Sequence, residues 1–141
     1  MKLSPYIMFP GNAEEALKFY EKCLHGEIKY LGRFKDFPME SPEEYKDKVM
    51  HASFYFGENL IMACDNIPGE TPLGDSNIQL SMDVPDIVEL EVVFNKLANE
   101  GKVTMPLQDT HWGARFGMLT DKFGIKWMFS HENEKKDSAD S

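Results

Sequence analysis

The sequence predicts an α+β fold built from two βαβββ modules. The first observation is a repeat: a strand-like run, a helical segment and three further strand-like runs occur in residues 1–67 and again in residues 78–131. A repeat at this scale constrains the fold more than any local motif does. The second observation is a turn between the last two runs of each copy, at residues 57–59 and 121–124. Each copy is therefore expected to end in a β-hairpin.

The first module begins with a predicted strand at residues 3–9 and a helix at residues 11–26. Asn12 is the expected N-cap, with Glu15 at the spacing of a capping box, and Gly26 is the expected left-handed stop. One face of this helix carries the apolar residues Ala13, Ala16, Leu17, Tyr20 and Leu24. Three strands are predicted next, at residues 27–34, 49–56 and 60–65. An insertion at residues 36–48 contains Ser41 and Pro42, which predict the start of a short helix.

The second module repeats this order, with a strand at residues 78–83 and a helix that begins at Pro85 and Asp86. Its apolar face is formed by Leu90, Val93, Phe94, Leu97 and Ala98. Gly101 ends the helix, and a positive φ is expected there. The last three strands are predicted at residues 102–105, 115–120 and 125–130. Between the final two, Asp121 comes first and Gly124 fourth, as a type I turn prefers.

The two modules are expected to form one domain of residues 1–133. Module one covers residues 1–67, a linker rich in proline and glycine covers residues 68–77, and module two covers residues 78–131. Residues 132–141 are acidic and almost without apolar side chains. They are expected to form a disordered tail.

Charge and composition narrow the function classes. The net charge is -9, which disfavours nucleic acid and anionic membranes as partners. No apolar run approaches the ~18 residues of a membrane span. The two cysteines, Cys23 and Cys64, fit a reducing compartment. A cytoplasmic protein is the expectation.

Three motifs carry a family resemblance. They are PYIMFPGNAEEALKFY, VMHASFYFGENLIM and VTMPLQDTHWGARFGMLTDKFGIKWMFS. On these motifs the chain resembles the PhnB-like branch of the vicinal oxygen chelate superfamily, which includes glyoxalases, bleomycin-resistance proteins and extradiol dioxygenases. The resemblance implies curved mixed sheets that form a cleft, helices outside, a small-molecule ligand and a homodimer. The branch is often labelled methyltransferase-like, but no Gly-rich loop here supports binding of S-adenosylmethionine.

The resemblance also implies one divalent metal, held by the first and last strands of each module. The first strand of module one offers no ligand, and the last offers only Cys64 and Asp65. In module two, the first strand offers Gln79, and the last offers nothing before His131 and Glu132. A thiolate, an amide and a distant imidazole make a poor site for a hard metal. We therefore expect no cofactor, with His51, Asp65 and Gln79 as weak metal candidates and one divalent metal ion as the alternative.

Arg115 is the first candidate for binding a ligand. Gly113, Arg115 and Gly117 fall on one face of a strand. The glycines leave room for the guanidinium to grip a carboxylate or phosphate. An internal ion pair, to Asp65 or Asp109, is the open alternative.

Further candidates lie on the predicted strands. His51, Ser53 and Tyr55 share one face of residues 49–56, and this polar face is expected to meet the cleft. His51 is then a candidate general acid or base, or a histidine bonded to a strand neighbour. The remaining ligand-binding candidates are aromatic or polar residues that could line the cleft: Trp112, Trp127, Tyr6, Phe9 and Gln79. Cys64 has no local activating group in the sequence and is expected to be a small buried residue.

Three functions remain open at this stage. The expected one is a small-molecule-binding protein without the inherited metal. The alternative is a divalent-metal-dependent lyase, isomerase or dioxygenase, and a third is a structural dimer without a ligand. The charge of the chain suits a cationic ligand, whereas Arg115 in the cleft favours an anionic or neutral one.

Overall fold

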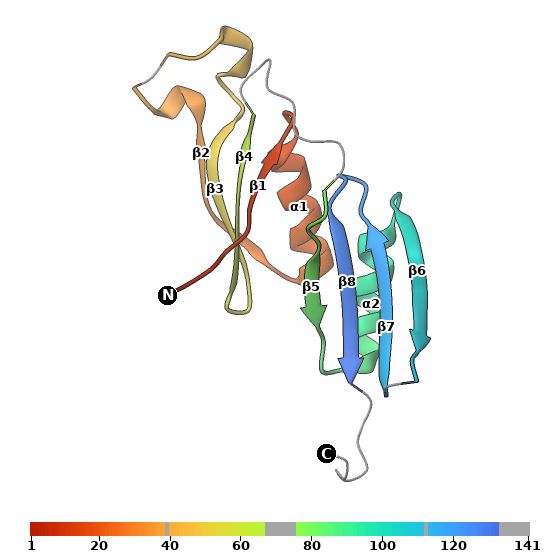
Figure 1. Cartoon of the computed structure of the whole chain (residues 1–141). Helices are drawn as coiled ribbons and strands as arrows, with labels where there is room; N and C mark the ends of the chain where they lie inside the picture. Colours follow the sequence, from red (N-terminus) through yellow and green to blue (C-terminus); the bar gives the residue numbers. More distant parts are fainter. Residues whose placement is uncertain (39, 67–75, 112, 133–141) are drawn as a thin grey trace. The chain divides into compact units, whose positions relative to one another are not determined.

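The computed structural model describes residues 1–38, 40–66, 76–111 and 113–132. The chain divides into two compact units, Met1–Gly74 (unit 1) and Asp75–Ser141 (unit 2). Each unit holds one α-helix and one four-stranded mixed sheet (Figure 1). The predicted βαβββ order is confirmed in both units. Trp112, most of the predicted linker and almost all of the predicted tail lie outside the described residues.

Unit 1 contains the sheet β1-β4-β3-β2. Strand β1 runs parallel to β4, and the other neighbours are antiparallel. In chain order its main elements are β1 (Tyr6–Phe9), α1 (Ala13–Leu24), β2 (Glu27–Arg33), β3 (Val49–Phe56) and β4 (Asn59–Asp65). The predicted insertion forms two short 3-10 turns, Phe34–Asp36 and Glu43–Tyr45.

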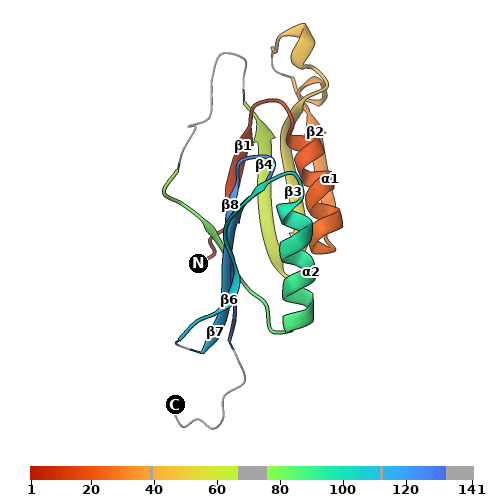
Figure 2. The ribbon, with the colours of Figure 1, turned by 90° about the vertical axis from the view of Figure 1, so that its right-hand side faces the viewer.

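Helix α1 covers one face of the unit 1 sheet (Figure 2). The predicted apolar stripe of the helix is buried, together with Cys23. The sheet meets it with alternate buried residues of three strands: Phe9, Ala52, Phe54, Ile61 and Ala63. Because side chains alternate along a strand, this core leaves the residues between them on the opposite face.

Unit 2 repeats the plan with the sheet β5-β8-β7-β6, in which β5 runs parallel to β8. Its elements are β5 (Leu80–Asp83), α2 (Ile87–Ala98), β6 (Lys102–Asp109), β7 (Ala114–Thr120) and β8 (Lys126–Glu132). Its core joins the buried helix residues to buried strand residues: Leu90, Val93, Phe94, Leu97, Leu119, Trp127 and Phe129. Across the described residues, neither helix has the length and apolar character needed to traverse a bilayer.

The two helices begin in different ways. The Asp86 carboxylate accepts hydrogen bonds from Val88 N at 2.9 Å and Glu89 N at 3.4 Å and so caps α2, which begins one residue after the predicted start at Pro85 and Asp86. The predicted cap of α1 is wrong, since the Asn12 side chain forms no capping hydrogen bond. Asp65, at the end of β4, accepts from Ala13 N at 2.8 Å instead. The start of α1 is thus bound to the end of β4, the strand beside β1.

The glycines after the helices are needed for a reason other than the predicted one. The left-handed conformation falls one residue earlier, on His25 (φ 56) and Glu100 (φ 61). Gly26 and Gly101 instead sit against a neighbouring strand. A Cβ at Gly26 would lie 2.6 Å from the carbonyl oxygen of Tyr55, and one at Gly101 would lie 2.5 Å from that of Thr120. Both positions therefore require glycine because the backbones approach closely.

Candidate functional site

The candidate site lies on the sheet face of unit 1 opposite α1, which we call the distal face. Strand β3 places His51, Ser53 and Tyr55 there, since Ala52 and Phe54 are buried on the helix side. The predicted grouping of these polar residues on one face is confirmed. By register and alternation, the neighbouring strands add a set of sulfur and aromatic side chains to this face: Tyr6, Met8, Met62 and Cys64.

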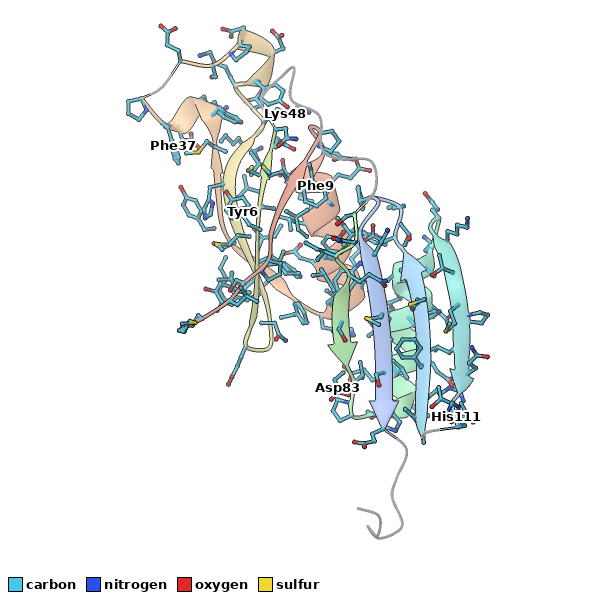
Figure 3. All side chains as sticks on the ribbon, in the orientation of Figure 1. Tyr6, Phe9, Phe37, Lys48, Asp83 and His111 are labelled. Carbon is cyan, nitrogen blue, oxygen red and sulfur yellow. The ribbon has the colours of Figure 1, made fainter. Side chains whose placement is uncertain are left out.

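His51 lies between two tyrosines on this face. The hydroxyl of Tyr6 and Nδ1 of His51 are hydrogen-bonded at 2.9 Å, and the ring centroids are 5.5 Å apart. Tyr30 lies 6.0 Å from the same imidazole, centroid to centroid. In Figure 3, Tyr6 is labelled on the sheet of unit 1, where it belongs to β1, and Phe37 is labelled in the segment that follows β2. The predicted candidates Tyr6 and His51 thus form one hydrogen-bonded pair, and Tyr30 joins it.

Tyr30 reaches this position because of two local features of β2. The register with β3 shifts between Ile28 and Tyr30, so that Tyr30 pairs with Ser53 and shares its face. Gly32 pairs directly with His51. A Cβ at Gly32 would lie 2.6 Å from the hydroxyl oxygen of Tyr30. The missing side chain therefore leaves space for the end of the Tyr30 ring.

The sequence reasoning did not include Cys64 in the site. Strand register places its thiol on the same face as Tyr6, and burial together with the nearby Cys64 raises the pKa of Tyr6 to about 12. Burial also raises the pKa of the Cys64 thiol, although the nearby Tyr6 opposes that change. Cys64 is half-buried rather than buried. Both groups therefore hold their protons at neutral pH, and the thiol is not an activated nucleophile.

Two other predicted contacts lie apart from this cluster. Tyr55 is on the distal face, where the Lys29 ammonium lies 5.3 Å from the centroid of its ring. Gln79 is exposed and directly precedes β5 of unit 2. Among the predicted polar contacts, Tyr6, His51 and Tyr55 therefore share a face, and Gln79 belongs to the other unit.

For Arg115 the structure favours one of the two arrangements left open by the sequence. Arg115 and Gly117 do share a face of β7, but it is the face covered by α2. Arg115 forms ion pairs with Glu91 of α2 at 3.3 Å and with Asp109 of β6 at 3.2 Å. A Cβ at Gly117 would lie 3.0 Å from the Phe94 ring. The internal ion pair to Asp109, left open as an alternative, is the observed arrangement.

Two aromatic candidates are also misplaced by the prediction, because they belong to the cores. Phe9 and Trp127 are each 2% exposed and lie on the helix sides of their sheets. The Trp127 indole N–H donates to Asp121 Oδ2 at 2.9 Å. Large apolar rings are packed on the face of a sheet that is most deeply buried. The alternation of side chains along a strand does not by itself show which of the two faces is the buried one. Trp112 lies outside the described residues.

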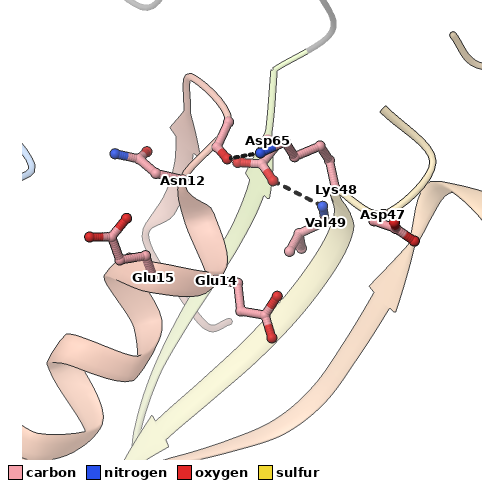
Figure 4. A pocket seen from close by; sticks show the side chains of 8 residues that line it. Asn12, Glu14, Glu15, Asp47, Lys48, Val49 and Asp65 are labelled. Carbon is pink, nitrogen blue, oxygen red and sulfur yellow. Dashed lines mark hydrogen bonds between the residues drawn. The ribbon is translucent and has the colours of Figure 1, made fainter. Parts of the chain in front are cut away.

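A hollow of about 220 Å³ lies at the start of α1 (Figure 4). The carboxylates of Asp65, Glu14 and Asp47 in its lining already have partners. Asp65 accepts from Val49 N at 2.9 Å as well as from Ala13 N, and the Arg33 guanidinium, 2.9 Å from Glu14, holds the pKa of that carboxyl below its usual value. The Lys48 ammonium donates to the Gly11 carbonyl at 2.8 Å. We interpret this hollow as a structural joint between helix, sheet and insertion.

A second hollow, of about 280 Å³, lies in unit 2 where β6 and β7 meet. Its lining is Met105, Gln108, Asp109, Thr110, His111 and Phe116. The Asp109 carboxylate there is bound to Arg115. The thioether and phenyl groups make its lining mainly apolar.

The donors that a divalent metal needs do not come together. Of the weak candidates, Asp65 faces the helix with both oxygens bonded to backbone N–H groups. His51 is on the opposite face of that sheet, and Gln79 is in the other unit. Within residues 1–38, 40–66, 76–111 and 113–132, no three His, Cys, Asp or Glu side chains are grouped as a metal site requires. The residues present do not fit the metal that the fold family implies.

Comparison with known proteins places the chain among close relatives. The sequence profile of the family described as 3-demethylubiquinone-9 3-methyltransferase matches residues 1–130. Protein YjdN of Escherichia coli is 31% identical, over 92% of this chain and 95% of that protein. A crystal structure of protein PA1353 from Pseudomonas aeruginosa is 40% identical, with a TM-score of 0.86 over 95% of this chain and 99% of that one. A protein from Bacillus cereus described as a putative 3-demethylubiquinone-9 3-methyltransferase, PhnB protein, is 29% identical, with a TM-score of 0.79 over 93% and 99% of the two chains.

More distant structures share the fold alone. The glyoxylase/bleomycin resistance protein/dioxygenase domain from Frankia is 16% identical, with a TM-score of 0.70 over 94% of this chain and 98% of that one. Two βαβββ units with mixed four-stranded sheets are the architecture that these proteins have in common.

Proposed function

The chain belongs to the 3-demethylubiquinone-9 3-methyltransferase family, the PhnB-like branch of the glyoxalase and bleomycin-resistance superfamily, and from this premise we propose that it binds a small molecule on the distal face of unit 1. The observation that carries the proposal is the Tyr6–His51 hydrogen bond of 2.9 Å, with Tyr30 beside the same imidazole. The residues that the structure describes leave Nε2 of His51 without a hydrogen-bond partner. An imidazole held by one nitrogen presents the other to a ligand.

The exposure of this face supports the proposal. Tyr6 is 45%, Tyr30 48% and Met8 57% exposed, although all three are large side chains. Aromatic and thioether groups around a few fixed polar atoms are typical of ligand sites. Cytoplasmic location and a homodimer are part of the same proposal; the first is supported by two cysteines that remain free thiols.

The methionines provide a direct test, because each unit carries its own methyl probes. Met8 and Met62 belong to the distal face of unit 1, whereas Met118 and Met128 pair on the face of the unit 2 sheet opposite α2. A library of small aromatic molecules is screened by thermal shift, and each hit is mapped by methyl NMR. We expect hits to shift Met8 and Met62, and a hit at about 100 times its Kd to stabilise the protein by about 2.7 kcal/mol.

Two variants serve as a matched pair in this screen. His51→Leu is expected to abolish the thermal shift, and Ser130→Ala, on the corresponding face of unit 2, is expected to leave it unchanged. A library without hits would favour the structural dimer. Hits that shift only Met118 and Met128 would place the ligand in unit 2 and contradict the proposal.

We carry the metal-dependent enzyme as the second candidate, because the superfamily implies it, although the donor set does not favour it. Purified, untagged protein is analysed for bound metal and then titrated with Ni²⁺, Mn²⁺, Zn²⁺ and Fe²⁺. A near-stoichiometric metal with a stabilising thermal shift would overturn the proposed function.

A further inference from the structure

The protons on Cys64, Tyr6 and His51 determine what the candidate site offers to a ligand. The hydroxyl of Tyr6 is hydrogen-bonded to Nδ1 of His51 at 2.9 Å, and Cys64 lies on the same face. The thiol and the phenol are both protonated at neutral pH, because burial raises the pKa of each. A neutral imidazole carries one N–H. The proton in the Tyr6–His51 bond therefore belongs either to the phenol or to Nδ1.

The Tyr6–His51 bond can run in two directions. In one, the phenol donates to Nδ1, and the imidazole proton lies on Nε2. In the other, Nδ1 donates to the phenol oxygen. A phenol is the stronger donor of the two groups, and an unprotonated imidazole nitrogen is the stronger acceptor. The phenol proton therefore belongs on the Nδ1 bond, and Nε2 carries a hydrogen.

The surroundings of the imidazole are aromatic and uncharged. Tyr6 and Tyr30 lie at ring-centroid distances of 5.5 Å and 6.0 Å from it. Arg115, which would have favoured an anion, is paired with Glu91 and Asp109 in the other unit. Arg33, at the end of β2, is paired with Glu14. No ion pair involves Tyr6, Tyr30 or His51 in the described part of the chain, and the cation that the structure places on this face, Lys29, lies over the Tyr55 ring instead.

We propose that the distal face of unit 1 binds a neutral, planar aromatic molecule that carries a carbonyl-type oxygen, with the Nε2–H of His51 donating to that oxygen. This inference rests on the proposed function, since it names the ligand chemistry of the same site. The tyrosine rings supply stacking surface, and the Tyr6–His51 bond fixes the imidazole tautomer. Tyr6 acts here as a positioning residue through His51.

The first measurement concerns the tautomer and needs no ligand. Long-range ¹H–¹⁵N NMR of the full-length protein at pH 8 is expected to show His51 protonated on Nε2. Tyr6→Phe removes the donor to Nδ1 and is expected to produce a mixture of both tautomers, while Ser53→Ala on the same face leaves the spectrum of His51 unchanged. A wild-type imidazole protonated on Nδ1 would overturn the inference.

The second measurement uses two probes of the same shape. 2-Acetylnaphthalene has a carbonyl oxygen where 2-isopropenylnaphthalene has a methylene group. One hydrogen bond of about 1 kcal/mol predicts roughly fivefold tighter binding of the ketone. In His51→Leu the two probes are expected to bind equally. Equal binding to the wild-type protein, or no binding of either probe, would contradict the ligand class.

These outcomes separate the inference from the proposed function. If the methionine probes of unit 1 respond to other molecules but the ketone has no advantage, the site stands and the ligand class is wrong. If no molecule shifts the methyl NMR signals of Met8 or Met62, the proposed site is wrong, whichever tautomer His51 adopts. Gly32→Ala provides a graded check, because its Cβ would displace only the end of the Tyr30 side chain and reduce binding of both probes alike.

Discussion

The two units share a backbone plan, but they differ in how their helices start and in what their sheets present. Helix α2 is capped by Asp86, the residue before its first turn. Helix α1 is capped by Asp65, which also accepts from Val49 N and is 3% exposed. The distal face of unit 1 carries a histidine, a thiol and tyrosines, whereas the corresponding face of β7 and β8 pairs Phe116 with Ser130 and Met118 with Met128. The two units therefore share one topology, whereas they differ in the carboxylates that cap their helices and in the polar side chains on the open faces of their sheets.

The largest expected effect comes from removing the distant cap. Asp65→Ala leaves two buried N–H groups without a partner, and we expect a loss of about 3 kcal/mol in the free energy of unfolding. Asp86→Ala removes an exposed local cap and should cost about 1 kcal/mol. Urea denaturation measures both. Equal losses in the two variants would show that the distant carboxylate holds the helix no more strongly than the local one.

The glycines that follow the helices should behave alike in the two units. In Gly26→Ala and Gly101→Ala the new Cβ would meet the carbonyl oxygen of Tyr55 or of Thr120, and overpacking of this kind costs about 2 kcal/mol. Glu100→Gly, the control, removes a side chain from a left-handed residue and should not destabilise the protein. Thermal unfolding of all three variants decides the matter. A tolerated alanine at residue 101 would contradict the close approach of α2's end to β7.

Arg115→Ala tests whether the guanidinium serves the fold or a ligand. Its partners Glu91 and Asp109 belong to the same unit, and the side chain is 27% exposed. We expect a loss of about 1 kcal/mol in the free energy of unfolding and no change in ligand binding at the distal face of unit 1. If Arg115→Ala keeps its stability but no longer binds ligand, Arg115 contacts the ligand after all.

The smallest effect concerns the alkaline titration of Tyr6. Its pKa is raised to about 12, so the folded protein keeps a proton that the unfolded chain releases near its ordinary value. The resulting stability is present below about pH 10 and is lost as pH rises toward about 12. Burial also raises the pKa of Tyr45, so absorbance at high pH should show late phenols, one of which is missing in Tyr6→Phe. That variant should also lose stability less steeply over the same pH range. Identical titrations of the two proteins would mean that Tyr6 is not held as described.

Local signals predicted most of the fold. The periodicities located every strand and both helices, Asp86 was identifiable from its position, and the turn at Asp121 formed as its residues indicate, with Gly124 N donating to the Asp121 carbonyl at 2.9 Å. Alternation also placed His51, Ser53 and Tyr55 together. These features depend on neighbours in the chain, which is why a sequence alone was sufficient.

The errors arose where distant groups decide the outcome. Asp65 caps α1 across the sheet, and no local pattern marks such a contact. The register shift in β2 moves Tyr30 to the distal face, against simple alternation. For β7, alternation grouped Arg115 with Gly117 correctly, but the tertiary neighbours Glu91 and Phe94 of α2 show which face meets the helix. The site was thus predicted in part, and its tyrosine–thiol surroundings were not.

The parallel pairing of β1 with β4, and of β5 with β8, has a consequence for biosynthesis. The opening strand of each unit cannot find its partner until the closing strand has left the ribosome. From the moment the closing strand emerges until the opening strand docks, the outer edge of the hairpin has an unsatisfied row of backbone donors and acceptors, and a second strand of the same design is synthesised soon afterwards. Prompt docking of each early strand is therefore what keeps a nascent duplicated chain from pairing its halves with one another.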